Sequence, residues 1–128
     1  MLSDERSDYA EAALEYVVRE GATVPGNFYS EVAQVLLSAE RHRRIDAASA
    51  SASLWELLQL PMEIEAADPQ MMLTLARRHR LSCYDAAYLA VAFQAKLPLA
   101  TLDASLRKAA DSVDLLWSPT TPRRRKSR

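Results

Sequence analysis

Residues 81–110 read LSCYDAAYLAVAFQAKLPLATLDASLRKAA, and this stretch decides the fold. Its first half, 81–93, is apolar nearly all round, which predicts a helix that is buried on most sides. The segment 97–101 then predicts a strand, and Asp103 is typical of a residue that begins the next helix, which should run through Ala110. A buried helix that leads into a strand and a further helix indicates an α/β domain.

The sequence on either side of this stretch alternates between helical and extended patterns. Capping residues followed by apolar positions at helical spacing predict four more helices, which begin near Ser3, Asn27, Asp46 and Asp68. Short extended segments are expected at 22–24, 61–64 and 113–116. Strands that alternate with helices are typical of a parallel sheet covered on both faces, so we predict a three-layer α/β/α fold with a short parallel sheet.

Length and composition exclude several classes of protein. A chain of 128 residues with 49% apolar residues fits one domain with a real core. No apolar run approaches the roughly 18 residues of a membrane span, and the acidic N-terminus is unlike a signal peptide. The single cysteine, Cys83, lies in a predicted buried segment, so we expect it to be packed rather than reactive. A reducing, cytoplasmic setting is the simplest interpretation.

The charge is distributed unevenly along the chain. Five of the sixteen basic residues lie in the last six positions, so residues 1–122 carry eleven basic and seventeen acidic residues, a charge of −6. Such a body is unlike a globally basic nucleic-acid binder. We predict a domain over 1–117 and a basic, proline-containing flexible tail over 118–128. The tail either contacts phosphates or only solubilises the chain.

Asp85 is the acid whose surroundings are most unusual. It is the only charged residue between Arg80 and Lys96, and a carboxylate near buried surface is costly unless something pairs with it. One interpretation is a capping box, in which Ser82 and Asp85 satisfy the start of the helix. The other interpretation is a functional site, and the spacing leaves both open.

Asp103 and Glu31 also follow predicted strands. Either can be explained structurally, Asp103 as a helix N-cap and Glu31 as a solvated acid in a first helical turn. However, ligand sites in open α/β sheets lie at the carboxyl ends of the strands. Several carboxylates at these ends are typical of a site for a hard cation such as Mg²⁺ or Mn²⁺. Such an ion can activate water for attack on a phosphodiester. With only two glycines, the chain has no glycine-rich nucleotide loop.

Two segments carry a family resemblance. Residues 81–110 resemble the C-terminal half of PIN-domain toxins of the VapC type, and residues 24–45, VPGNFYSEVAQVLLSAERHRRI, are similar to their second-strand and helix region. The resemblance implies a ribonuclease toxin that uses Mg²⁺ or Mn²⁺, is silenced by a cognate antitoxin and often forms a homodimer. It implies that the catalytic residues and metal ligands are Glu31, Asp85 and Asp103, and that the supporting residues are Thr101 and Ser82.

The start of the chain departs from this family. Such domains open with a central strand that carries an aspartate, whereas residues 1–5 resemble only the segment that follows it. We therefore expect that Met1 is an internal methionine of a longer product, and that the chain as written is weak or inactive. Two alternatives remain open: a non-catalytic, degenerate PIN domain that binds an antitoxin, and a structural α/β domain whose acids are only caps.

Overall fold

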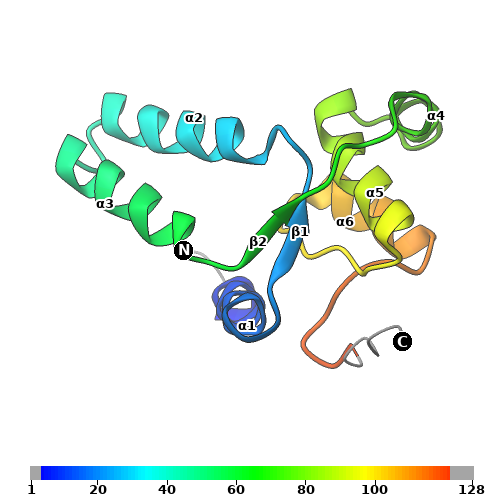
Figure 1. Ribbon diagram of the computed structural model, residues 1–128, viewed down its shortest axis with the longest axis horizontal. Helices are drawn as coiled ribbons and strands as arrows, with labels where there is room; N and C mark the ends of the chain where they lie inside the picture. Colours follow the sequence, from blue (N-terminus) through cyan, green and yellow to red (C-terminus); the bar gives the residue numbers. More distant parts are fainter. Residues whose placement is uncertain (1–3, 122–128) are drawn as a thin grey trace.

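The computed structural model describes residues 4–121, which form six helices and two short strands (Figure 1). In chain order they are α1 (Asp4–Glu20), β1 (Ala22–Val24), α2 (Phe28–Arg41), α3 (Ala47–Leu58), β2 (Met62–Ile64), α4 (Pro69–His79), α5 (Cys83–Ala95) and α6 (Ala104–Ser112). The α/β fold class is confirmed. Among these residues, no helix has the length and apolar character that a membrane span requires.

The helix starts lie where the capping residues predict them. Asp46 accepts a hydrogen bond from the backbone N–H of Ser49, at 2.7 Å, and so begins α3. Asp68 begins α4 in the same way, with proline at the first helical position, and Ser82 begins α5. Each cap satisfies a backbone donor that the first turn of a helix leaves unpaired.

The sheet is shorter than the sequence predicts. β1 and β2 pair in parallel, with Ala22 opposite Met62 and Val24 opposite Ile64. The predicted strands 97–101 and 113–116 are wrong in extent, because they are reduced to one parallel bridge between Leu99 and Leu116. Leu99 uses both of its backbone groups on this bridge, donating to Leu115 O and accepting from Trp117 N. Among residues 4–121, the bridge at Leu99 stays separate from the two-stranded sheet of β1 and β2.

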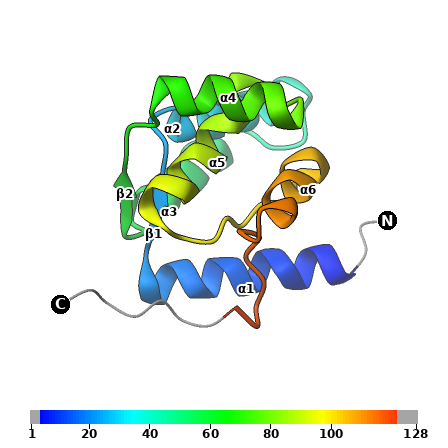
Figure 2. The ribbon, with the colours of Figure 1, turned by 90° about the vertical axis from the view of Figure 1, so that its right-hand side faces the viewer.

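The core is built around α5, as its apolar sequence predicts. Ala86, Leu89 and Ala90 are fully buried, and the core cluster also takes in Leu75 of α4 and Leu106 of α6. Figure 2 shows α4 and α6 beside α5, with α1 on the opposite side of the extended segment that follows α5. At about 2 kcal/mol for each large apolar side chain, this burial stabilises the domain more than any cap does.

The pair of helices α2 and α3 lies outside this core. The two helices pack against each other and project away from α4–α6 (Figure 1). α2 has no buried residue and α3 has only Ala50, while Val35 and Trp55 are 68% and 67% exposed. Large apolar side chains exposed on one projection are typical of an interaction surface.

The turn between α1 and β1 depends on glycine. Gly21 has φ +80°, and a Cβ atom there would lie 2.8 Å from the carbonyl oxygen of Pro61. We predict that Gly21→Ala lowers the free energy of unfolding by about 1–3 kcal/mol, because both the backbone conformation and the contact become strained. Gly26→Ala is the matched control, since nothing lies within 4 Å of its added Cβ. Equal midpoints for the two variants in denaturant unfolding would contradict this account.

Candidate functional site

The three predicted site acids all lie at helix starts. Glu31 is in the first turn of α2, which follows β1, and Asp85 is in the first turn of α5. Asp103 is the N-cap of α6, which follows the extended segment around Leu99. Positive helix N-termini favour nearby carboxylates, so the fold can place acids at these positions at low cost.

Glu31 is held by two hydrogen bonds that converge on one oxygen. Tyr88 Oη of α5 and Asn27 Nδ2 each donate to Glu31 Oε2 at 2.6 Å. Asn27 Nδ2 also lies 3.5 Å from the backbone oxygen of Tyr84, which joins the start of α2 to the start of α5. Burial, followed by the hydrogen bond and charge of Glu31, raises the pKa of the Tyr88 hydroxyl, which therefore stays protonated as a donor.

The pKa of Asp85 indicates that the other two acids lie near it. Burial is the main cause that raises the pKa of its carboxyl group, and repulsion from the charges of Asp103 and Glu31 raises it further. A hydrogen bond from Ser82 acts in the opposite direction. Ser82 Oγ also accepts from the backbone N–H of Asp85 at 3.1 Å, so half of the predicted capping box is present. Asp85 therefore has a capping partner and is also destabilised by neighbouring charge.

Asp103 performs the capping role that its sequence context predicts. Its Oδ1 accepts from the backbone N–H of Leu106 at 2.8 Å, and its own N–H donates to Thr101 Oγ1 at 3.1 Å. Arg107 donates to the backbone oxygen of Thr101 at 2.8 Å and stacks over the ring of Tyr9. These contacts fix the turn that carries Asp103 and Thr101, so the carboxyl group of Asp103 is held in one position at the start of α6.

The three acids have the donor atoms that a divalent cation prefers, but they are not close enough together to form a complete metal site. Carboxylate oxygens are the donors that hard cations prefer, and a cation would relieve the repulsion felt by Asp85. Within residues 4–121, however, no group of three or more acid, histidine or cysteine side chains is close enough together to hold a metal ion. The assignment of Glu31, Asp85 and Asp103 as ligands remains a prediction.

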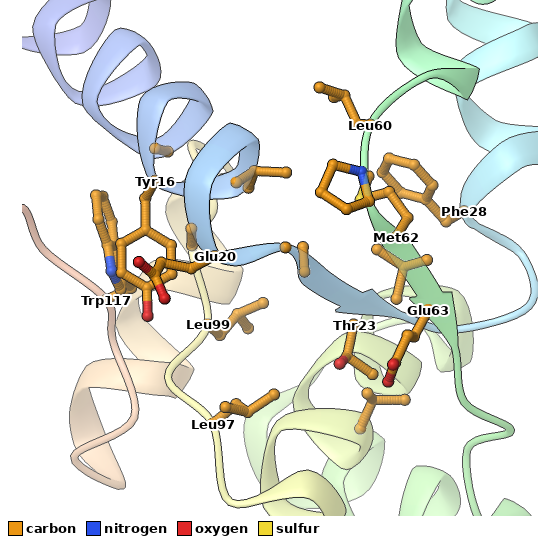
Figure 3. Close-up of a pocket in the computed structure, with 18 of the residues that line it drawn as sticks. Tyr16, Glu20, Thr23, Phe28, Leu60, Met62, Glu63, Leu97, Leu99 and Trp117 are labelled. Atoms are coloured by element: carbon orange, nitrogen blue, oxygen red, sulfur yellow. The ribbon is translucent and has the colours of Figure 1, made fainter. Parts of the chain in front are cut away.

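A large cavity lies beside this region. It has a volume of about 1050 Å³ and opens between β1 and the segment 97–100, with α1 on one face and α5 on the other. In Figure 3 Leu97, Leu99 and Trp117 border it on one side, and Thr23 borders it on the other. We call it the central cavity. Tyr88 lines it and also binds Glu31, so the cavity and the acids share a residue.

Sequence reasoning missed or misjudged several residues. Asn27 and Tyr88 were not identified as partners of Glu31, although Asn27 lies one helical turn before it and Tyr88 one turn after Asp85. Cys83 is exposed, not packed, because it occupies the first turn of α5 on the side that faces away from the core. The end of the predicted tail, 122–128, lies outside the described residues, while Ser118 and Thr121 form a hydrogen-bonded turn.

Comparisons with known proteins identify relatives of this chain. The sequence matches the PIN domain family over residues 1–112. The crystal structure of PAE2754 from Pyrobaculum aerophilum is similar, with a TM-score of 0.66 and 27% sequence identity. That match covers 78% of this chain and 76% of the archaeal chain. No curated protein matches the sequence.

The raised pKa of Asp85 makes its contribution to stability depend on pH. Because the native state holds this proton more tightly, the contribution is fully present below the ordinary pKa of 3.8 and is lost as the pH rises through the raised value. Asp85→Asn cannot ionise, so we predict that the variant gains stability relative to wild type over this pH range. Thermal unfolding between acid and neutral pH measures the difference, and Asp111→Asn, at an exposed acid, is the control. Parallel profiles for wild type and Asp85→Asn would refute it.

The bond between Tyr88 and Glu31 should be energetically coupled. We predict that a double-mutant cycle with Tyr88→Phe and Glu31→Gln gives a coupling of about 1–3 kcal/mol, as expected for a hydrogen bond to a charged group. Tyr84→Phe is the matched control, because its side chain is 69% exposed on the same helix. Its cycle with Glu31→Gln should give no coupling. A Tyr88 cycle that also gives none would show that the bond has no effect on stability.

Proposed function

The chain belongs to the PIN domain family, and from that premise we propose that it is a toxin-type, metal-dependent endoribonuclease of the VapC type. PIN domains are typically metal-dependent nucleases and are often found as toxins. The observation that carries the proposal is geometric: Glu31, Asp85 and Asp103 lie at the starts of three different helices, α2, α5 and α6. The raised pKa of Asp85 supports it, because burial and then the charges of Asp103 and Glu31 act on that carboxyl group. Acids that repel one another at one place, at a cost to the fold, are typical of a functional site.

In this proposal Asp85, Asp103 and Glu31 hold Mg²⁺ or Mn²⁺. The bound ion would supply an activated water and neutralise charge on the phosphodiester. Asn27 and Tyr88 restrain Oε2 of Glu31, so the carboxylate keeps one orientation toward α5. The turn through Thr101 and the N-cap bond fix Asp103. The residues of this chain thus act mainly by holding the oxygen ligands in place for the cation. A cytoplasmic location is a separate prediction.

A second candidate function is favoured by two observations. The described acids do not form a closed metal site, and α2 and α3 expose Val35 and Trp55. A degenerate domain that binds a cognate antitoxin, or a second copy of itself, through this projection would need no metal. Apolar side chains that are exposed in the single chain would become buried in such a complex.

Metal-dependent cleavage of RNA tests the nuclease proposal. We predict that purified protein cleaves single-stranded RNA with Mn²⁺ and not with chelator, and that Asp85→Asn lowers the rate about 100-fold or more, since altered metal ligation usually has effects of this size. Asp111→Asn, on the exposed side of α6, should retain the wild-type rate. Calorimetric titration with Mn²⁺ separates lost metal binding from lost chemistry.

The other outcomes distinguish the alternatives. Co-purification with an antitoxin without any cleavage would favour the binding module, and Trp55→Ala should then weaken the complex more than Asp85→Asn does. If Asp85→Asn leaves cleavage intact and costs only about 1 kcal/mol of stability, the acid is a helix cap and the site assignment fails.

A further inference from the structure

The C-terminal end of α4 carries a concentration of positive charge. Arg77 and Arg78 lie in the last turn of the helix, and Arg80 is its C-cap. All three residues are exposed, whereas Nε2 of His79, which lies between them, is buried. Within residues 4–121, no carboxylate forms an ion pair with any of these arginines. We call Arg77, Arg78 and Arg80 the basic end of α4.

Helix capping does not account for this much charge. A cation near the last turn of a helix is favourable because that end of the helix is negative, but the effect is small where the side chain is exposed. α5 ends with one basic residue, Lys96, and has no other in its last turn. The three guanidinium groups at the end of α4 repel one another, since no described acid pairs with them. Such unneutralised charge attracts anionic ligands.

The basic end of α4 lies next to the candidate acids. Only Leu81 separates Arg80 from Ser82, the N-cap of α5, so the Cα atoms of these two residues are at most about 7 Å apart. Asp85 lies in the first turn of the same helix, and α4 packs beside α5 (Figure 2). No arginine is among the groups that shift the pKa of Asp85. The arginines and the acids are therefore neighbouring but separate charged surfaces.

We propose that the basic end of α4 binds the phosphate groups of an RNA strand that lies across the candidate acids. This inference rests on the proposed function, which supplies RNA as the ligand, and it names the surface that holds the strand. Residues 1–122 carry a charge of −6, so most of the body repels a polyanion. Guanidinium groups bind phosphate oxygens through pairs of N–H donors, and these three have no carboxylate to displace.

A second basic segment lies too far from the acids to serve the same purpose. Arg41, Arg43 and Arg44 are at the turn between α2 and α3, at the end of the projection that points away from α5 (Figure 1). Along the axis of α2, Arg41 is about 15 Å from Glu31, because a helix rises about 1.5 Å per residue. This segment has the same number of arginines and therefore provides a control of equal charge.

The single cysteine of the chain provides a probe at the proposed surface. Cys83 is exposed in the first turn of α5, and in the sequence it lies between the basic end of α4 and Asp85. A fluorophore on Cys83 is titrated with a single-stranded RNA of about six nucleotides in the presence of chelator, so that binding is measured without cleavage. We expect a saturable change in emission, with a Kd that rises steeply with salt because bound arginines release counterions from RNA.

Removal of the three charges should weaken this binding. The test variant combines Arg77→Gln, Arg78→Gln and Arg80→Gln. We expect its Kd for RNA to be at least about tenfold higher. The slope of log Kd against log salt concentration should fall by about 2, since each phosphate contact on a single strand contributes about 0.7 to it.

The control variant removes equal charge from the tip of the projection. It combines Arg41→Gln, Arg43→Gln and Arg44→Gln. We expect its Kd to stay within about twofold of wild type and its salt slope to stay unchanged, because at about 0.1 M salt charges more than about 10 Å away are largely screened.

A pair of glycine variants separates loss of the ligand from loss of the fold. Arg80 and Lys96 both have left-handed backbone, with φ 55° and 56°, a conformation that favours glycine. Arg80→Gly and Lys96→Gly should therefore both raise the midpoint of denaturant unfolding, whereas only Arg80→Gly should weaken RNA binding. Weaker binding by a more stable protein cannot come from unfolding. Arg80→Lys keeps the charge and should keep the wild-type salt slope.

Several results would overturn the proposal. No saturable emission change, or an unchanged Kd and salt slope in the variant of the basic end, would show that the phosphates lie elsewhere. Equal losses in the control variant would show only a general attraction. If polyglutamate binds labelled Cys83 as tightly as the RNA does, the surface recognises an acidic protein instead.

Failure of the nuclease proposal can be recognised separately. RNA that binds with the expected salt slope but is not cleaved with Mn²⁺ would reject the nuclease and leave the basic end of α4 as an RNA-binding surface. RNA that is cleaved with Mn²⁺, but binds with a slope that the three substitutions do not change, would reject the basic end alone.

Discussion

The burial of α5 is the interaction on which the rest of the structure depends. Ala86, Leu89 and Ala90 have no exposed surface, and they contact elements on several sides of the helix. A helix that is apolar nearly all round has no place for a charged side chain among its buried residues, so charged groups lie at its ends. This explains why Asp85 and Ser82 lie at its start, and why the core that stabilises the domain also fixes the position of its most unusual acid.

The same packing makes the ionised form of Asp85 unfavourable for the stability of the fold. Asp85 lies close enough to the core for burial to raise its pKa, and two further acids approach it from α2 and α6. A fold selected only for stability would place a neutral side chain here. The hydrogen bonds to Glu31 from Asn27 and Tyr88 act against dispersal of the acids, because they restrain one of the repelling carboxylates near α5.

Features with local causes could be predicted from the sequence. The caps at Asp46, Asp68, Ser82 and Asp103 depend on bonds that span two or three residues, so the sequence near each helix start is sufficient. The burial of α5 follows from its composition alone. Strand extent was predicted less well, because a strand needs a partner: 97–101 has the expected residues but meets only the segment around Leu116.

In the candidate site, too, local features could be predicted from the sequence and contacts between distant residues could not. Its acids could be named from position and family resemblance, but the contact between Tyr88 and Glu31 joins residues that are 57 positions apart. Tyrosine in an apolar helix is expected to pack, and nothing in the adjacent sequence indicates a carboxylate partner. Only the approach of the first turn of α2 to α5 in the folded chain brings the two groups together.

Tyr88 connects the acids physically to the central cavity. One part of its side chain lines the cavity between α1 and α5, and its hydroxyl group holds Glu31. A side chain that packs along an occupied cavity has less freedom than one that borders an open space, because the surrounding atoms select its rotamer. The atoms that surround Tyr88 in the cavity wall therefore also bear on where its hydroxyl group holds Glu31. Tyr88 thus joins the apolar wall of the cavity to the acids at the helix starts.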